Sequence, residues 1–186
     1  PLWRSDFHAE ATRADFEIGA QSQTYGLSFW VPLSGQGSGA RTTSYAVRST
    51  MTGGLILGGW SPWGINPVEG EKLLSEVKQV RPFFYGDYYP LSEYTLSPDA
   101  WMAYQFHRPD LGKGIVLAFR RSMNAPANFT FVPTGLDPDK TYEITMVDAG
   151  SSRRMTGEEL ATAGYSITLP LSNPYALLFT YREIYQ

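Results

Sequence analysis

The 186-residue chain contains no cysteine and only two histidines, His8 and His107. The lack of cysteine excludes disulfide bonds, thiolate zinc sites, iron–sulfur clusters and thiol nucleophiles. The histidines lie far apart in the sequence, and neither has a partner at the HxxxH spacing of a zinc-binding helix. We therefore expect neither a metal site nor any other bound cofactor.

Charged residues are scarce as well. They make up 18% of the chain, against about 25% in an average globular domain. The 15 Lys and Arg and the 18 Asp and Glu give a formal net charge of -3, so no overall positive field attracts phosphate groups. Nucleic acid is not an expected partner.

Long hydrophobic runs are missing too. No apolar stretch approaches the roughly 18 residues of a membrane span, and no charged and apolar leader segment follows Pro1. We expect a soluble chain without a membrane partner, and the sequence points to no particular compartment. Because the chain begins with proline rather than methionine, we also expect that it is cut or processed at its start.

Aromatic residues, in contrast, are abundant at 15% of the chain, and from residue 98 onward the apolar residues alternate with period two. Turn-forming Gly, Pro, Asn and Asp separate the alternating segments. Evenly spaced short strands are typical of antiparallel sandwiches. We expect a Greek-key-like β-sandwich over residues 98–186, with a helical turn at residues 155–160 and strands at residues 101–107, 114–120, 128–132, 142–147, 165–169 and 175–181.

The first half of the chain contains one clear helix pattern. Asn66 is a suitable N-cap and Pro67 suits the first helical position. Apolar residues then recur at a spacing close to 3.6, and Pro82 ends the pattern. This pattern predicts a helix over residues 67–81, with Leu73, Leu74, Val77 and Val80 on its buried face.

Two strand-like pieces, residues 26–31 and 55–57, precede this helix. So few elements cannot cover both faces of a parallel sheet. We therefore predict that residues 1–97 form a partial (β/α)-barrel segment, which self-association or a missing upstream barrel segment completes. The predicted fold class is α+β and mainly β, with the β-sandwich after the barrel segment.

Four consecutive residues near the start combine an aromatic ring, a cation, a hydroxyl and a carboxylate: Trp3, Arg4, Ser5 and Asp6. Arg4 lowers the pKa of a neighbouring carboxyl group, whereas apolar burial raises that pKa, as a general acid at neutral pH requires. The segment is therefore either a surface ion pair or part of a catalytic site.

Two aromatic clusters are candidate sugar-binding surfaces. Asp87 and Tyr88 lie in a segment with five aromatic residues, and Trp60 and Trp63 lie between glycines directly after an apolar piece. Aromatic rings stack on the C–H faces of sugars, and a carboxylate accepts hydrogen bonds from sugar hydroxyls. The alternative for both clusters is packing in the core.

Several segments resemble bacterial α-galactosidases of the melibiase type, which form glycoside hydrolase family 36. In the first half, the segments that carry this resemblance are residues 1–7, 21–32, 45–49 and 81–91. In the second half, residues 135–142, 157–160 and 164–169 resemble the C-terminal β-sandwich of that family. The resemblance covers nearly the whole chain.

The resemblance implies a retaining glycosidase built on a (β/α)8 barrel, with an acid/base aspartate in a Trp-x-Ser-Asp segment. Asp6 matches this acid/base position, and Trp3, Arg4 and Ser5 would line the sugar site beside it. The family's nucleophile segment, a Lys-Trp-Asp pattern, does not occur in this sequence, and neither do the first barrel strands. The substrate implied is a carbohydrate.

A second carboxylate decides the mechanism. It lies about 5–5.5 Å from the acid in retaining glycosidases and roughly 6.5–9.5 Å away in inverting ones. The spacing of the other acidic residues singles out none of Glu10, Asp15, Glu17 and Asp87. A lone Asp6 can protonate a leaving oxygen but cannot complete hydrolysis.

Three hypotheses follow. The first is a fragment or truncated form of a glycoside hydrolase that acts on α-galactoside-type or other oligosaccharide bonds, inactive by itself. The second is a small free-standing glycosidase with a non-standard second carboxylate or a site completed by a partner chain. The third is a non-catalytic carbohydrate-binding or interaction module, whose stacking residues would be Trp60, Trp63, Tyr85, Tyr88 and Tyr89.

Overall fold

The computed structural model describes residues 2–3, 16–31, 33–38, 43–55, 66–170, 172 and 174–185. The chain divides into two compact units, Pro1–Tyr85 (unit 1) and Gly86–Gln186 (unit 2). This boundary lies earlier than the expected one after residue 97. The reason is that β3 (Asp87–Pro90) pairs with a strand of the unit 2 sheet.

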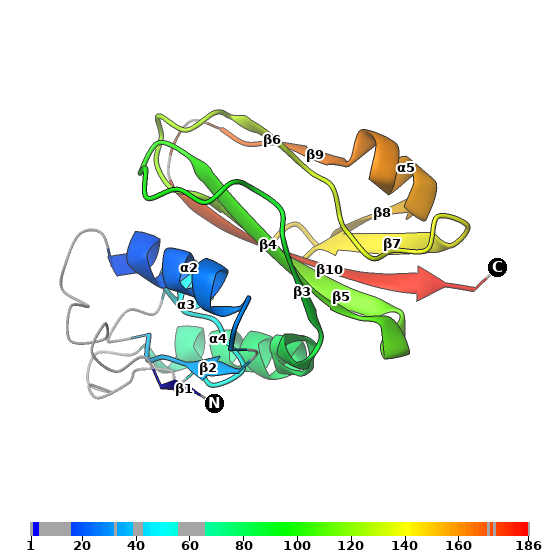
Figure 1. The fold of residues 1–186 in the computed structure, drawn as a ribbon. Coiled ribbons are helices and arrows are strands. Elements are labelled where there is room, and N and C mark those ends of the chain that lie inside the picture. Colours follow the sequence, from blue (N-terminus) through cyan, green and yellow to red (C-terminus); the bar gives the residue numbers. More distant parts are fainter. Residues whose placement is uncertain are drawn as a thin grey trace. The chain divides into compact units, whose positions relative to one another are not determined.

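Unit 1 begins with a strand–helix–strand arrangement. Strand β1 (Leu2–Trp3) pairs in parallel with β2 (Ser34–Gly35), and helix α2 (Phe16–Leu27) lies between them in sequence (Figure 1). Parallel neighbours joined through a helix form a βαβ unit, from which (β/α) barrels are built. The partial (β/α)-barrel segment stays a prediction.

The chain returns to β2 once more after helix α3 (Ser44–Ser49). The amide of Gly54 donates a hydrogen bond to the carbonyl of Ser34 at 3.1 Å. A Cβ atom at Gly54 would lie only 2.9 Å from the Cα of Gly35. This close approach of two backbones requires glycine.

Helix α2 contradicts one expectation. Residues 26–31 were predicted to be a strand, but α2 extends to Leu27 and a turn follows. The buried side of α2 includes Gln21, Ser22 and Thr24, so it lacks an apolar stripe at helical spacing. Its apolar residues Phe16, Ala20 and Tyr25 are buried too. A polar contact adds to this packing: the side-chain amide of Gln21 donates to the hydroxyl of Ser49 in α3 at 2.9 Å.

Helix α4 (Pro67–Val80) confirms the predicted helix and its cap. The Asn66 side chain accepts hydrogen bonds from the amides of Val68 and Glu69. Of the predicted buried face, Leu74 is the exception at 39% exposure. Helical structure does not end at Pro82, because a 3₁₀ helix, η1 (Arg81–Tyr85), follows α4 directly.

A buried ion pair joins α3 to α4. The guanidinium of Arg48 donates to both carboxylate oxygens of Glu76, at 2.8 and 2.6 Å. Their side chains are only 3% and 13% exposed. This bidentate geometry compensates the cost of burying both charges.

Unit 2 is built on a six-stranded antiparallel sheet in the order β3-β4-β5-β10-β7-β8 (Figure 1). The last strand in sequence lies between β5 and β7, so its neighbours are distant in sequence, as in Greek-key sandwiches. Besides β3, the strands are β4 (Trp101–Arg108), β5 (Lys113–Arg120), β7 (Thr141–Met146), β8 (Ser151–Thr156) and β10 (Tyr175–Ile184). The short 3₁₀ helix η2 (Pro109–Leu111) joins β4 to β5.

A second layer covers one face of this sheet. It consists of the antiparallel pair β6 (Asn128–Phe131) and β9 (Tyr165–Thr168) and of helix α5 (Gly157–Ala163). Phe131 from β6 stacks on Tyr165 and packs against Phe179 of β10 at 5.2 Å. The expected β-sandwich and its six predicted strands are confirmed.

Two of the unit 2 strands were not predicted. Strand β3 is short, and β8 occupies residues where a turn and a helical turn were expected. Helix α5 begins only after Thr156, which forms a reciprocal capping box with Glu159. In β8, Arg153 and Arg154 are exposed, and such charged residues on an edge strand oppose pairing with other chains.

A fully buried arginine stabilises the loop between β5 and β6 through hydrogen bonds. Arg120 donates hydrogen bonds to the carbonyls of Ala125, Met123 and Pro170, at distances of 2.7–3.1 Å. The planar guanidinium can reach several acceptors at once because its donors form a fork. Arg120 thereby connects the end of β5 to the segment before β10.

Candidate functional site

The strongest catalytic prediction lies directly after β1. Asp6, Arg4 and Ser5 are outside the described residues, and of Trp3 the structure gives only the backbone in β1. The carboxyl end of β1 at Trp3 nevertheless leads directly into these residues. In parallel α/β folds, ligand sites lie at the carboxyl ends of strands.

The neighbouring carboxyl end, that of β2, carries a buried polar row. Ser34, Gln36 and Ser38 are at most 6% exposed. Among the residues that the structure describes, neither polar atom of the Gln36 side-chain amide has a hydrogen-bond partner. Such an unsatisfied group is costly unless something binds it. The alternation of polar residues with glycine in residues 34–39 has the period of a strand, and this is the sequence signal for the buried row.

The predicted aromatic sites are only partly within the described residues. Trp60 and Trp63 lie outside the described residues. Asp87 is exposed in β3, opposite His107 of β4. The ring of Tyr88 is half-buried and packs against Phe106 and Tyr104, at centroid distances of 5.4 and 6.3 Å. Tyr88 thus adds to the packing of unit 2, and its role in sugar binding stays a prediction.

A polar network lies inside the unit 2 core. The Tyr181 hydroxyl is 2.9 Å from Nδ1 of His107. It accepts a hydrogen bond from the side-chain amide of Gln105 at 2.7 Å. Gln105 also bonds to both the carbonyl and the amide of Thr134. Burial lowers the pKa of His107, and the charge of Asp87 opposes this shift only in part. Burial also raises the pKa of Tyr181. The network joins β4, β10 and the segment after β6 within unit 2.

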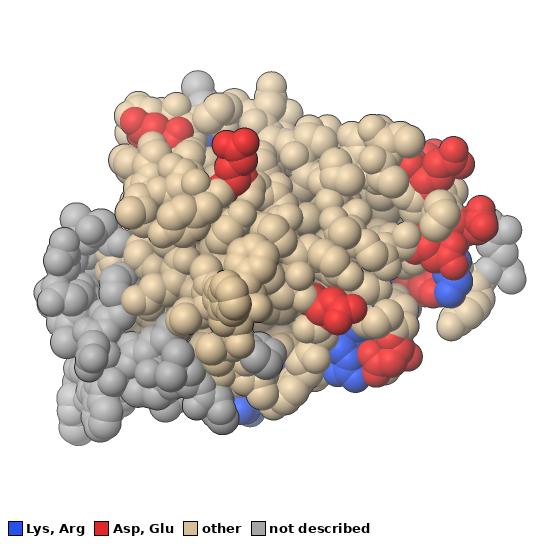
Figure 2. Space-filling view, viewed as in Figure 1, with Lys and Arg blue, Asp and Glu red and all other residues tan. Residues whose placement is uncertain are grey.

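The face drawn in Figure 2 shows little charge organisation. Charged groups are few there, and most of the visible Lys and Arg atoms lie beside Asp or Glu (Figure 2). Examples of such pairs are Arg108 with Asp110 at 2.6 Å and Arg182 with Glu143 at 2.6 Å. In the described part of the chain, no cluster of three His, Asp or Glu side chains could hold a metal ion. Within the same residues, no helix is long and apolar enough to cross a membrane.

Comparison with known proteins gives matches to a glycosidase domain profile and to solved α-galactosidases. Residues 101–177 match the profile of the glycosyl hydrolase family 36 C-terminal domain. None of the curated sequences matches the chain significantly. Among solved structures, the chain is similar to the galactosidase domain of AgaSK, an α-galactosidase–sucrose kinase, with a TM-score of 0.69 and 21% identity. The similarity covers 90% of this chain and 25% of that one.

Two family 36 α-galactosidases from Geobacillus stearothermophilus are similar as well. AgaB gives a TM-score of 0.69, and a variant of AgaA in complex with stachyose gives 0.71. Both are 21% identical to this chain, and 90% of this chain matches 24% of theirs. The chain therefore spans about a quarter of the length of these structures. Unit 2 has the β-sandwich fold of the family 36 C-terminal domain, which relates the chain to the C-terminal part of these glycoside hydrolases.

Proposed function

We propose that the chain is the C-terminal part of a family 36-type glycosidase, with Asp6 as its general acid/base. The observation that carries this proposal is the match of the family 36 C-terminal domain to residues 101–177. The parallel β1–α2–β2 arrangement adds support, because its first strand ends directly before Arg4, Ser5 and Asp6. Unit 1 would then be the end of a (β/α) barrel.

The substrate class proposed is an oligosaccharide with an α-galactosyl group. The similar solved proteins are described as α-galactosidases, and the AgaA variant was solved with stachyose. A carbohydrate also suits the chemistry of the Trp3–Arg4–Ser5–Asp6 segment, because a ring and hydroxyl-binding groups stand beside an acid. Trp60, Trp63, Asp87 and Tyr88 are further proposed sugar contacts.

Catalysis would need two carboxylates. Asp6 in its protonated form would donate a proton to the glycosidic oxygen as the bond to the leaving group breaks. A second carboxylate about 5–5.5 Å away would attack the anomeric carbon, and Asp6 would then deprotonate the water that releases the sugar. We assign this second carboxylate to the upstream barrel segment, which would also complete unit 1.

The coding region before Pro1 tests the proposal first. A continuous reading frame that contains a Lys-Trp-Asp segment would support it, and a start codon directly before Pro1 would overturn it. The protein extended by this upstream segment should hydrolyse aryl α-galactosides.

Asp6→Ala in the extended protein tests the acid/base role. We expect a rate loss of about 10²–10⁴-fold for the general acid/base step. Azide needs no base, so it should restore turnover and yield a galactosyl azide of the α configuration. The matched control is Glu71→Ala on the exposed side of α4, which should keep the full rate. Loss of activity without azide rescue would contradict the assigned role.

A further inference from the structure

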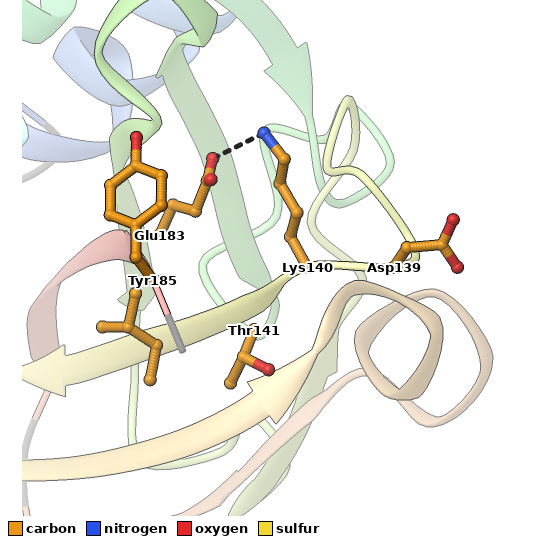
Figure 3. A pocket seen from close by; sticks show the side chains of 6 residues that line it. Asp139, Lys140, Thr141, Glu183 and Tyr185 are labelled. Carbon is orange, nitrogen blue, oxygen red and sulfur yellow. Dashed lines mark hydrogen bonds and ion pairs between the residues drawn. The ribbon is translucent and has the colours of Figure 1, made fainter.

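A groove opens at one end of the unit 2 sandwich, where β7 begins and β10 ends. It has a volume of about 410 Å³ and is lined by Asp139, Lys140, Thr141, Glu183, Ile184 and Tyr185. This volume is within the usual range of small-molecule sites, about 300–1,000 Å³. In Figure 3, the side chains of Tyr185, Glu183 and Lys140 stand on the same side, whereas Asp139 points away from them.

Tyr185 offers an unoccupied aromatic face. It is 90% exposed, and within the described residues it makes no hydrogen bond or ring contact. Most large apolar side chains of unit 2 are buried in the sandwich core instead. An exposed ring with a hydroxyl at its tip can stack on an apolar face and bind a polar group at once.

An ion pair lies beside this ring. Nζ of Lys140 is 2.9 Å from Oε2 of Glu183, and their side chains are 46% and 11% exposed. The backbone of Glu183 is fixed, because its amide donates to the carbonyl of Gly112 at 2.7 Å. The ammonium carries three N–H donors, of which Glu183 uses one, and the carboxylate has a second oxygen as acceptor.

The ion pair is electrically neutral, which determines the kind of ligand that suits the groove. A phosphate or another strongly charged group would meet one partner of its own sign. A neutral ligand with adjacent hydroxyls can instead donate to the carboxylate and accept from the ammonium. We propose that this groove binds a neutral sugar, with its C–H face on Tyr185 and two neighbouring hydroxyls on Glu183 and Lys140.

This sugar site would belong to unit 2 alone and would contain none of the proposed catalytic residues. It therefore does not depend on Asp6. A glycosidase that binds oligosaccharides at such a separate site could retain its substrate outside the catalytic site. The sandwich would then have a role in binding the substrate.

The test is an NMR titration of the isotope-labelled 186-residue chain with melibiose, maltose and xylobiose. At least one sugar should shift the amide signals of residues 139–141 and 183–185. Tyr185→Ala should weaken this binding about tenfold, the size expected for loss of one aromatic contact. Tyr185→Trp should preserve the sugar binding. Glu183→Gln should weaken it, because the substitution removes the carboxylate that accepts the sugar hydroxyl and that pairs with Lys140.

Two controls separate this site from other parts of the chain. Tyr94→Ala removes another exposed tyrosine of unit 2, 54% exposed, and should leave the binding unchanged. Asp6→Asn should also leave it unchanged, so a failed catalytic proposal would not alter the result. Absence of shifts at the groove with all three sugars, or binding that survives Tyr185→Ala, would overturn the proposal.

Discussion

Arg120→Met tests how the unit 2 sandwich is held together. The wild-type guanidinium is fully buried and donates to three backbone carbonyls, those of Ala125, Met123 and Pro170. Methionine preserves most of the volume but removes every donor. A buried acceptor left without a partner costs about 1–3 kcal/mol, and removing the buried charge offsets part of the total. We expect a loss of about 3 kcal/mol in the free energy of unfolding of unit 2.

Urea unfolding followed by the NMR signals of unit 2 measures this loss. The matched control is Arg182→Met, because Arg182 donates two hydrogen bonds to Glu143 but its side chain is 60% exposed. Exposed ion pairs contribute about 0–1 kcal/mol, so the control should change little. Arg120→Lys keeps the charge without the planar fork and should lose most of the stability as well. Equal effects of the Arg120→Met and Arg182→Met substitutions would refute the reasoning.

The remaining predictions concern other elements. Because burial lowers the pKa of His107 in the folded state, the unfolded state takes up the proton first as the pH falls. The free energy of unfolding should therefore decline as the pH drops below 6.5, the unfolded value, and His107→Gln should flatten this decline in urea titrations at several pH values. An unchanged slope in the variant would contradict the assignment. Asn66→Ala removes the cap of α4 and should destabilise unit 1 by about 1 kcal/mol in the same assay; no loss would mean that the cap contributes nothing. Gly114→Ala would place a methyl carbon in steric conflict with the Tyr181 hydroxyl oxygen and 2.6 Å from the Phe106 carbonyl oxygen, and such overpacking costs about 1–3 kcal/mol; a neutral result would show that both Tyr181 and the backbone of β4 can move. An incomplete barrel exposes apolar strand edges, so the 186-residue chain should associate with itself as concentration rises in light scattering, and a constant monomer mass would speak against it.

The predictable part of the fold is the part with regular periodicity. The six predicted strands of unit 2 have alternating apolar residues and clear turn residues between them. Helix α4 has an N-cap, a proline at its first position and an apolar stripe. In these segments, local preference and tertiary packing favour the same structure.

The parts that were missed lack this agreement. Helix α2 buries Gln21 and Ser22, which produce no apolar stripe, and the edge strand β8 exposes Arg153 and Arg154. The pairing of β3 with β4 depends on contacts that no local pattern reveals. Tertiary context determines such segments more than intrinsic propensity does.

The candidate sites show the same division. Asp6 could be predicted because it lies in a short local motif that resembles a family. Such a motif is visible in a single sequence. The groove at Tyr185 was not predicted, because Lys140 and Glu183 are 43 residues apart in sequence and meet only through the pairing of β7 with β10. The unsatisfied Gln36 likewise becomes evident only when its burial is known.

The most direct test of the proposed function is hydrolysis of 4-nitrophenyl α-D-galactopyranoside, measured side by side for the 186-residue chain and for the protein extended upstream. Our account predicts turnover by the extended protein, its loss in the Asp6→Asn variant, and no turnover above buffer by the chain alone, because the proposal assigns the second carboxylate to the upstream segment. Robust turnover by the 186-residue chain that Asp6→Asn abolishes would contradict it, because the chain would then contain both carboxylates.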